Sequence, residues 1–117
     1  MPEAANLAHK LTLFSEHWSP KIVSEYNGNE VMVAKLKGEY HWHKHEDTDD
    51  FFFVLSGRLV IETENGNVEM GPGDLYVVPK GVMHRPVAEE EVHILLMEPA
   101  GEPNSGDPAT AAKKVWI

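Results

Sequence analysis

Residues 39–50 read EYHWHKHEDTDD, which places His41, His43 and His45 at alternate positions. A β-strand sends every second side chain to the same face, so we expect the three imidazoles to point in one direction. If that face lines the interior of a β-barrel, two or three neutral imidazoles can bind a single divalent cation. Three aspartates follow directly along the chain, and each can supply a carboxylate to offset the charge of the metal.

The sequence on both sides of this stretch predicts an all-β fold. From residue 30 to residue 98, short runs rich in Val, Ile, Phe, Tyr and Leu are separated by Gly, Pro or Asn. The expected strands are Val31–Lys37, Tyr40–Lys44, Asp50–Leu55, Arg58–Glu64, Asn67–Met70, Leu75–Val78, His84–Val87 and Val92–Glu98. Asn65-Gly66 favours a tight hairpin, because both residues tolerate positive φ, and Ser56-Gly57 favours another reversal. Many short strands are best protected in a closed barrel or a two-sheet jelly roll, with an immunoglobulin-type sandwich as the alternative.

The regions outside the strands are expected to cover the barrel. We predict a single domain over residues 1–117, with a barrel core at about 31–98, an N-terminal arm at 1–30 and a C-terminal loop and tail at 99–117. Leu7, Leu11, Phe14 and Trp18 recur at helical spacing, which predicts a short helix or an irregular arm over the barrel mouth. The apolar residues 115–117 are expected to dock on the body or on a neighbouring subunit.

The composition disfavours several classes of partner and site. The chain has 117 residues, no cysteine, and 19 acidic against 10 basic side chains, which gives a formal charge of −9. Such a chain lacks the basic surface that nucleic acids and anionic membranes require, and no run approaches the ~20 apolar residues of a membrane span. The absence of cysteine removes disulfides and thiolate-bound metal centres. We expect a cytoplasmic protein with neither nucleic acid nor membrane as a partner.

Two stretches resemble the two motifs of the cupin superfamily, at the order and separation found in that family. The matching residues of the first motif are Gly38, His43, His45, Asp50 and Gly57, and those of the second are Gly73, Pro79, Gly81 and His84. The resemblance covers about residues 31–98 and is closest to small single-domain bacterial cupins, which are often described as mannose-6-phosphate isomerase-like. It implies a small double-stranded jelly-roll β-barrel.

The same resemblance implies one divalent metal bound by His43, His45, Asp50 and His84. Asp50 stands where most cupins have Glu, which is one methylene longer. Three histidines with solvent suit zinc, iron, nickel or copper, whereas an added carboxylate favours manganese or ferrous iron. The identity of the metal therefore stays open among Zn, Fe, Mn, Ni and Cu.

The residues around these ligands have their own expected roles. Asp50, Phe52 and Val54 share one strand face and should point inward, while Phe51 and Phe53 should pack outward. The side chains outside the motifs are expected to have ordinary roles: His9, His17 and His93 as surface or packing residues, Trp42 as a packing residue, and 89–91, three glutamates, as a solvated turn.

His41 lies two residues before His43, so on a strand its side chain would point to the same face as His43 and His45. We take His41 as the candidate catalytic residue, with hydrogen bonding at the barrel rim as the alternative.

A metal with open coordination positions predicts an enzyme acting on a small oxygenated or sugar-derived metabolite, through isomerase, lyase, hydrolase or dioxygenase chemistry. The alternatives are a non-catalytic module that binds a small ligand or a metal, and a vestigial site. Phosphosugars are disfavoured, because few cations have an inward position. The outward phenylalanines and the apolar terminus predict a homodimer.

Overall fold

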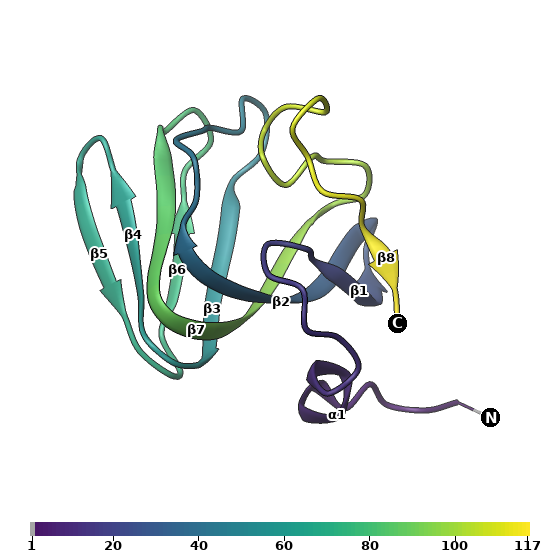
Figure 1. Ribbon diagram of the computed structural model, residues 1–117. Coiled ribbons are helices and arrows are strands. Elements are labelled where there is room, and N and C mark those ends of the chain that lie inside the picture. Colours follow the sequence, from purple (N-terminus) through teal and green to yellow (C-terminus); the bar gives the residue numbers. More distant parts are fainter. Residues whose placement is uncertain (1) are drawn as a thin grey trace.

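The computed structural model describes residues 2–117, which form a two-layered jelly roll (Figure 1). The elements in chain order are α1 (Leu7–Leu11), β1 (Lys21–Tyr26), β2 (Asn29–Glu39), β3 (Asp50–Ser56), β4 (Leu59–Thr63), β5 (Gly66–Met70), β6 (Leu75–Val78), β7 (His84–Pro99) and β8 (Val115–Trp116). Within residues 2–117, no helix is long and apolar enough to cross a membrane. The expected all-β jelly roll is confirmed.

Two long bent strands, β2 and β7, connect the two layers. The first half of β7 pairs with β4, and its second half pairs with β3, while β2 lies beside β7 along almost its whole length. The register between β2 and β7 shifts between Leu36 and Gly38, opposite the acidic residues 89–91. Figure 1 shows β7 curving through this region from one layer to the other. The bend curves the sheet so that its strands form the two layers of the barrel, and β-bulges commonly bend strands in this way.

The interior of the barrel is apolar except at one end. The core consists mainly of aliphatic side chains from the inward positions of β2, β3, β4 and β7, together with Phe52. Asp50, Phe52 and Val54 are all buried, which confirms the predicted alternation along β3. Phe51 and Phe53 are only partly buried and lie on the other face of the strand.

Three of the predicted elements are wrong in detail. Residues 40–44 form no strand and make a single isolated bridge, between His43 and His84. Val92–Glu98 is not separate from His84–Val87, because β7 is continuous and residues 89–91 lie within it as an exposed bend. The helix α1 forms, but it borders a surface groove beside Leu55 and His93 and does not lie over the barrel mouth.

The two ends of the chain add strands to one sheet. The predicted arm contains β1, which pairs antiparallel with β2, and the C-terminal β8 pairs in parallel with β1. The expected docking of residues 115–117 on the body is therefore confirmed, although the side chains of Val115 and Trp116 stay exposed. The hairpin between β4 and β5 is also confirmed, but its turn residues are Glu64 and Asn65, not Asn65 and Gly66, and of the expected pair Gly66 alone has a positive φ (125°).

Candidate functional site

His43 and His45 are placed by backbone hydrogen bonds to the second half of the chain. The His43 N–H donates to the carbonyl of His84 (3.0 Å), and the His84 N–H donates to the carbonyl of His43 (2.9 Å). The Gly81 N–H donates to the carbonyl of His45 (2.8 Å). These bonds extend the segment enough for alternate side chains to point inward, so His43 and His45 are buried while Lys44 is exposed.

Asp50 completes a compact group of four side chains. It is the first residue of β3, on the inward face, and its Oδ2 lies 2.8 Å from His84 Nε2, 3.3 Å from His45 Nε2 and 4.0 Å from His43 Nε2. One potential ligand atom from each residue lies within 4.8 Å of the others, and all four residues are buried. The structure thus brings together all four residues named by the sequence as metal ligands.

The other ring nitrogen of each histidine already has a partner. Nδ1 of His43 lies 3.0 Å from the carbonyl oxygen of His41, and Nδ1 of His84 lies 2.8 Å from that of Val82. Since a carbonyl only accepts, each Nδ1 carries the proton and donates it. In the neutral imidazole, Nε2 then keeps its lone pair, which is the tautomer that a metal ligand needs.

His45 is oriented by a carboxylate from the C-terminal loop. Its Nδ1 lies 3.0 Å from Glu102 Oε1, and Thr48 Oγ1 donates to the same oxygen at 3.3 Å. Lys114 donates to the Glu102 backbone carbonyl and forms ion pairs with Glu98 (2.8 Å) and Glu30 (3.2 Å). The last strands of the chain are therefore tied to a candidate metal ligand.

The buried Nε2 atoms of His43 and His45 make no hydrogen bond to the described residues, although Asp50 Oδ2 lies 3.3 Å from Nε2 of His45. Unpaired buried polar atoms are rare in folded proteins and cost free energy. A divalent metal bound between the imidazoles and Asp50 would satisfy both atoms. Three imidazoles and one carboxylate are a common donor set for first-row transition metals. The residues present therefore fit a metal.

Burial and neighbouring charged side chains shift the pKa values of the buried histidines and of Asp50 in opposite directions. Burial lowers the pKa of His43 to about 4, which keeps the imidazole neutral. Burial also lowers the pKa of His45, but the carboxylates of Asp50 and Glu102 outweigh this effect and raise the pKa to about 9. Burial raises the pKa of Asp50, and His45 and His84 more than offset it, so the net shift is downward. Protonated His45 therefore stabilises the metal-free fold fully below pH ~6.5 and loses this effect as the pH rises through about 9.

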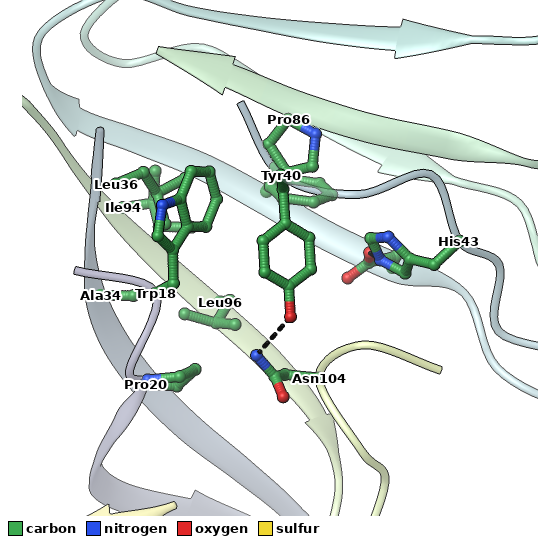
Figure 2. A pocket seen from close by; sticks show the side chains of 12 residues that line it. Trp18, Pro20, Ala34, Leu36, Tyr40, His43, Pro86, Ile94, Leu96 and Asn104 are labelled. Atoms are coloured by element: carbon green, nitrogen blue, oxygen red, sulfur yellow. Dashed lines mark hydrogen bonds and ion pairs between the residues drawn. The ribbon is translucent and has the colours of Figure 1, made fainter. Parts of the chain in front are cut away.

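An apolar cavity opens directly onto this group (Figure 2). The space inside it that the centre of a water molecule can reach is about 40 Å³, and His43 and Asp50 form part of its wall. The remaining wall is mostly apolar and aromatic, from Trp18, Pro20, Ala34, Leu36, Tyr40, Phe52, Pro86, Ile94, Leu96 and Asn104. No lysine or arginine lines this cavity in the described part of the chain.

The family described as Cupin domain (Cupin_2) matches residues 30–98. The chain belongs to this cupin family. The expectation drawn from the two motifs is thus confirmed, and both motifs lie around the group of four buried residues.

Solved structures agree with this assignment. The cupin is 42% identical to a cupin-2 domain protein of Shewanella frigidimarina, with a TM-score of 0.79 over 80% of this chain and 92% of that one. A hydroquinone 1,2-dioxygenase, PnpCD, crystallised with Cd2+ and 4-hydroxybenzonitrile, has a TM-score of 0.70 at 17% identity, over 90% of this chain and 73% of that one. This second likeness concerns the fold alone.

A curated relative, the uncharacterized protein YdbB of Bacillus subtilis strain 168, is 39% identical over 64 residues. The match spans 54% of this chain and 57% of that relative.

His41, the predicted catalytic residue, lies outside the group of four. Its side chain is exposed and stacks on Tyr40, with ring centroids 4.1 Å apart, while its backbone carbonyl accepts from His43. Residues 40–44 are not in a regular strand, so the expected common direction of three imidazoles holds for His43 and His45 only.

Sequence reasoning missed Glu102 and Asn104, which contact the site from an irregular loop. Such loops have no periodicity from which a contact could be inferred. Glu98, near the end of β7, is buried, and burial raises the pKa of its carboxyl, an effect that Lys114 partly offsets.

Proposed function

We propose that this cupin is a mononuclear metal enzyme acting on a small oxygenated molecule bound in the apolar cavity. The observation that carries the proposal is the pair of buried, unpartnered Nε2 atoms of His43 and His45, beside Asp50 and His84 at one end of that cavity. His43, His45, Asp50 and His84 would hold the metal. When bound, a divalent metal would polarise a substrate oxygen as a Lewis acid.

The chain's own residues supply binding and orientation in this proposal. Glu102 and the backbone carbonyls of His41 and Val82 hold the three imidazoles in one tautomer. The apolar walls exclude water from the bound molecule, and the absence of lining cations in residues 2–117 disfavours a phosphorylated substrate. A small neutral molecule with one or two oxygen donors fits these walls, and sugar-derived or aromatic oxygenated compounds belong to this class.

His41 is the candidate residue for proton transfer in this scheme. It is a titratable side chain that stacks on Tyr40 next to the cavity. His41→Gln removes the titratable ring and keeps a polar side chain, so we expect turnover to fall while metal content stays at the wild-type level. Equal turnover in both proteins would remove His41 from the mechanism.

The second candidate function is a binding module without turnover, and the absence of lysine and arginine from the cavity wall within residues 2–117 favours it. Oxygen uptake and product formation should be measured over diketones, catechols and uronates with iron, manganese, nickel and zinc loadings. We expect turnover with at least one combination of compound and metal, and loss of that turnover in His84→Ala. No turnover with any combination, together with tight ligand binding, would favour the binding module.

We further propose a cytoplasmic homodimer that forms through the outer face of β3 and β6. Phe51 pairs with Val77 and Phe53 with Leu75 across these strands, and Leu75 and Val77 are 55% and 39% exposed. Sedimentation should give a dimer at micromolar concentration, and Val77→Lys should shift it to the monomer. A monomeric wild-type protein would contradict this proposal.

A further inference from the structure

Tyr40 stands at the boundary between the metal ligands and the apolar cavity. Its ring packs edge-on against His43, with centroids 5.3 Å apart, and stacks on Trp18 at 4.8 Å. Trp18 is itself held by hydrogen bonds from its ring N–H to Lys37 and from its backbone N–H to Lys35, both 2.9 Å. Figure 2 shows the Tyr40 hydroxyl pointing along the cavity toward Asn104, away from His43.

The orientation of the Asn104 amide follows from its two hydrogen bonds. The Ala112 backbone N–H donates to Asn104 Oδ1 at 2.9 Å, and Asn104 Nδ2 donates to the Tyr40 hydroxyl oxygen at 3.3 Å. Exchanging Oδ1 and Nδ2 would set the amide NH2 against the Ala112 N–H, which is donor against donor. Asn104 therefore acts as the donor toward Tyr40.

The hydroxyl proton of Tyr40 then has no acceptor in the protein. Tyr40 receives a hydrogen bond from Asn104, and its hydroxyl makes no other hydrogen bond among the described residues. A phenol both accepts and donates, so the bond from Asn104 leaves the O–H free to point elsewhere. The free space next to it is the cavity, which both Tyr40 and Asn104 line.

We propose that Tyr40 binds the substrate by donating a hydrogen bond to an oxygen acceptor, and that Asn104 is the positioning residue that keeps this donor free. The inference rests on the proposed function and narrows its substrate class. The substrate is a small, mainly apolar molecule that carries a second oxygen acceptor beyond the atoms that face the metal ligands. A site built in this way rejects analogues without that acceptor, because the bound analogue would cover the Tyr40 O–H and leave its proton without an acceptor.

The test compares probes with and without an acceptor on the zinc-loaded protein, since zinc has no redox chemistry to consume them. The probes are 3- and 4-nitrocatechol, followed by absorbance, and 3- and 4-methylcatechol, measured by competition. Three variants are compared with the wild type. Tyr40→Phe keeps both ring stacks, Asn104→Asp offers a carboxylate that captures the Tyr40 proton, and Tyr26→Phe is the control at an exposed tyrosine.

We expect Tyr40→Phe to weaken at least one nitrocatechol by about five- to tenfold and its methyl counterpart by less than about twofold. Asn104→Asp should reduce the nitro-to-methyl affinity ratio by a similar factor, and Tyr26→Phe should leave the ratio unchanged. A ratio that stays at the wild-type value in Tyr40→Phe or in Asn104→Asp would overturn the inference, since a packing role affects both probes equally. A wild-type protein that takes up no zinc, or binds no catechol when loaded, would overturn the proposed function as well.

Discussion

Replacing Glu102 with alanine is expected to weaken metal binding about 10- to 100-fold without removing a ligand. The His45 side chain is only 1% exposed, and its Nδ1 donates to Glu102 at 3.0 Å. In the metal-bound protein the ring cannot turn away, so loss of the carboxylate leaves a buried N–H without an acceptor, which costs ~1–3 kcal/mol. In the metal-free protein the imidazole becomes free to rotate or to change tautomer, so the cost falls mainly on the bound form. Since 1.4 kcal/mol corresponds to a factor of ten in Kd, about 10- to 100-fold is the expected range.

The assay is competition between the metal-free protein and a chromophoric chelator for Zn2+ at pH 7.5. Glu46→Ala is the matched control, because Glu46 also carries one negative charge near the site but is exposed and, within residues 2–117, pairs only with Lys44 (3.2 Å). Circular dichroism of each metal-free variant verifies folding. The reasoning is refuted if Glu102→Ala binds zinc within about twofold of Glu46→Ala.

Three further predictions concern the charge, the packing and the protonation of the site. Asp50→Asn should lower zinc affinity at least ~tenfold by chelator competition, since the amide retains the shape but loses the charge; unchanged affinity would mean that Asp50 is not a ligand. Gly106→Ala should lower Tm by at least ~4 °C, because a Cβ there would collide with the Lys44 carbonyl at φ +77°, whereas Gly101→Ala, at φ +86° with no close neighbour, should lower it less; equal shifts would refute the collision. Zinc binding at pH 7.5 should release about one proton per ion, because His45 with a pKa of about 9 must lose its proton to coordinate. The measurement is titration calorimetry in buffers of different ionisation enthalpy, and a binding enthalpy that is the same in every buffer would refute the prediction.

The sequence predicted which four side chains lie together better than it predicted the elements that hold them. The alternation of His43 and His45, and of Asp50 with Phe52, requires only an extended backbone, and the structure provides one in both places. The strand predicted over residues 40–44 is absent because, among the described residues, this segment bonds to β7 only through the Tyr40 N–H and the bridge between His43 and His84. The alternation of side chains therefore predicted the inward direction of two of the three imidazoles correctly, and His41 lies outside the group of four.

The parts that sequence reasoning missed depend on contacts between distant segments. The glutamates at 89–91 look like a solvated turn, but they remain in β7 because β2 bends with it over a shared register shift. The strands β1 and β8 lie toward one edge of the sheet, where both residues of the edge strand β8 are exposed and only the first three residues of β1 are buried. Glu102 and Asn104 belong to a loop whose path is fixed by Lys114 and by the Ala112 N–H, and neither contact leaves a periodic pattern.

Metal content is the measurement that tests the central claim most directly. The protein should be purified without chelators, and its metals quantified by mass spectrometry alongside His43→Ala and His84→Ala. We predict about one transition-metal ion per wild-type chain and a loss of most of it in both variants. A wild-type protein without metal, or equal metal content in all three proteins, would contradict the assignment of His43, His45, Asp50 and His84 as the metal centre.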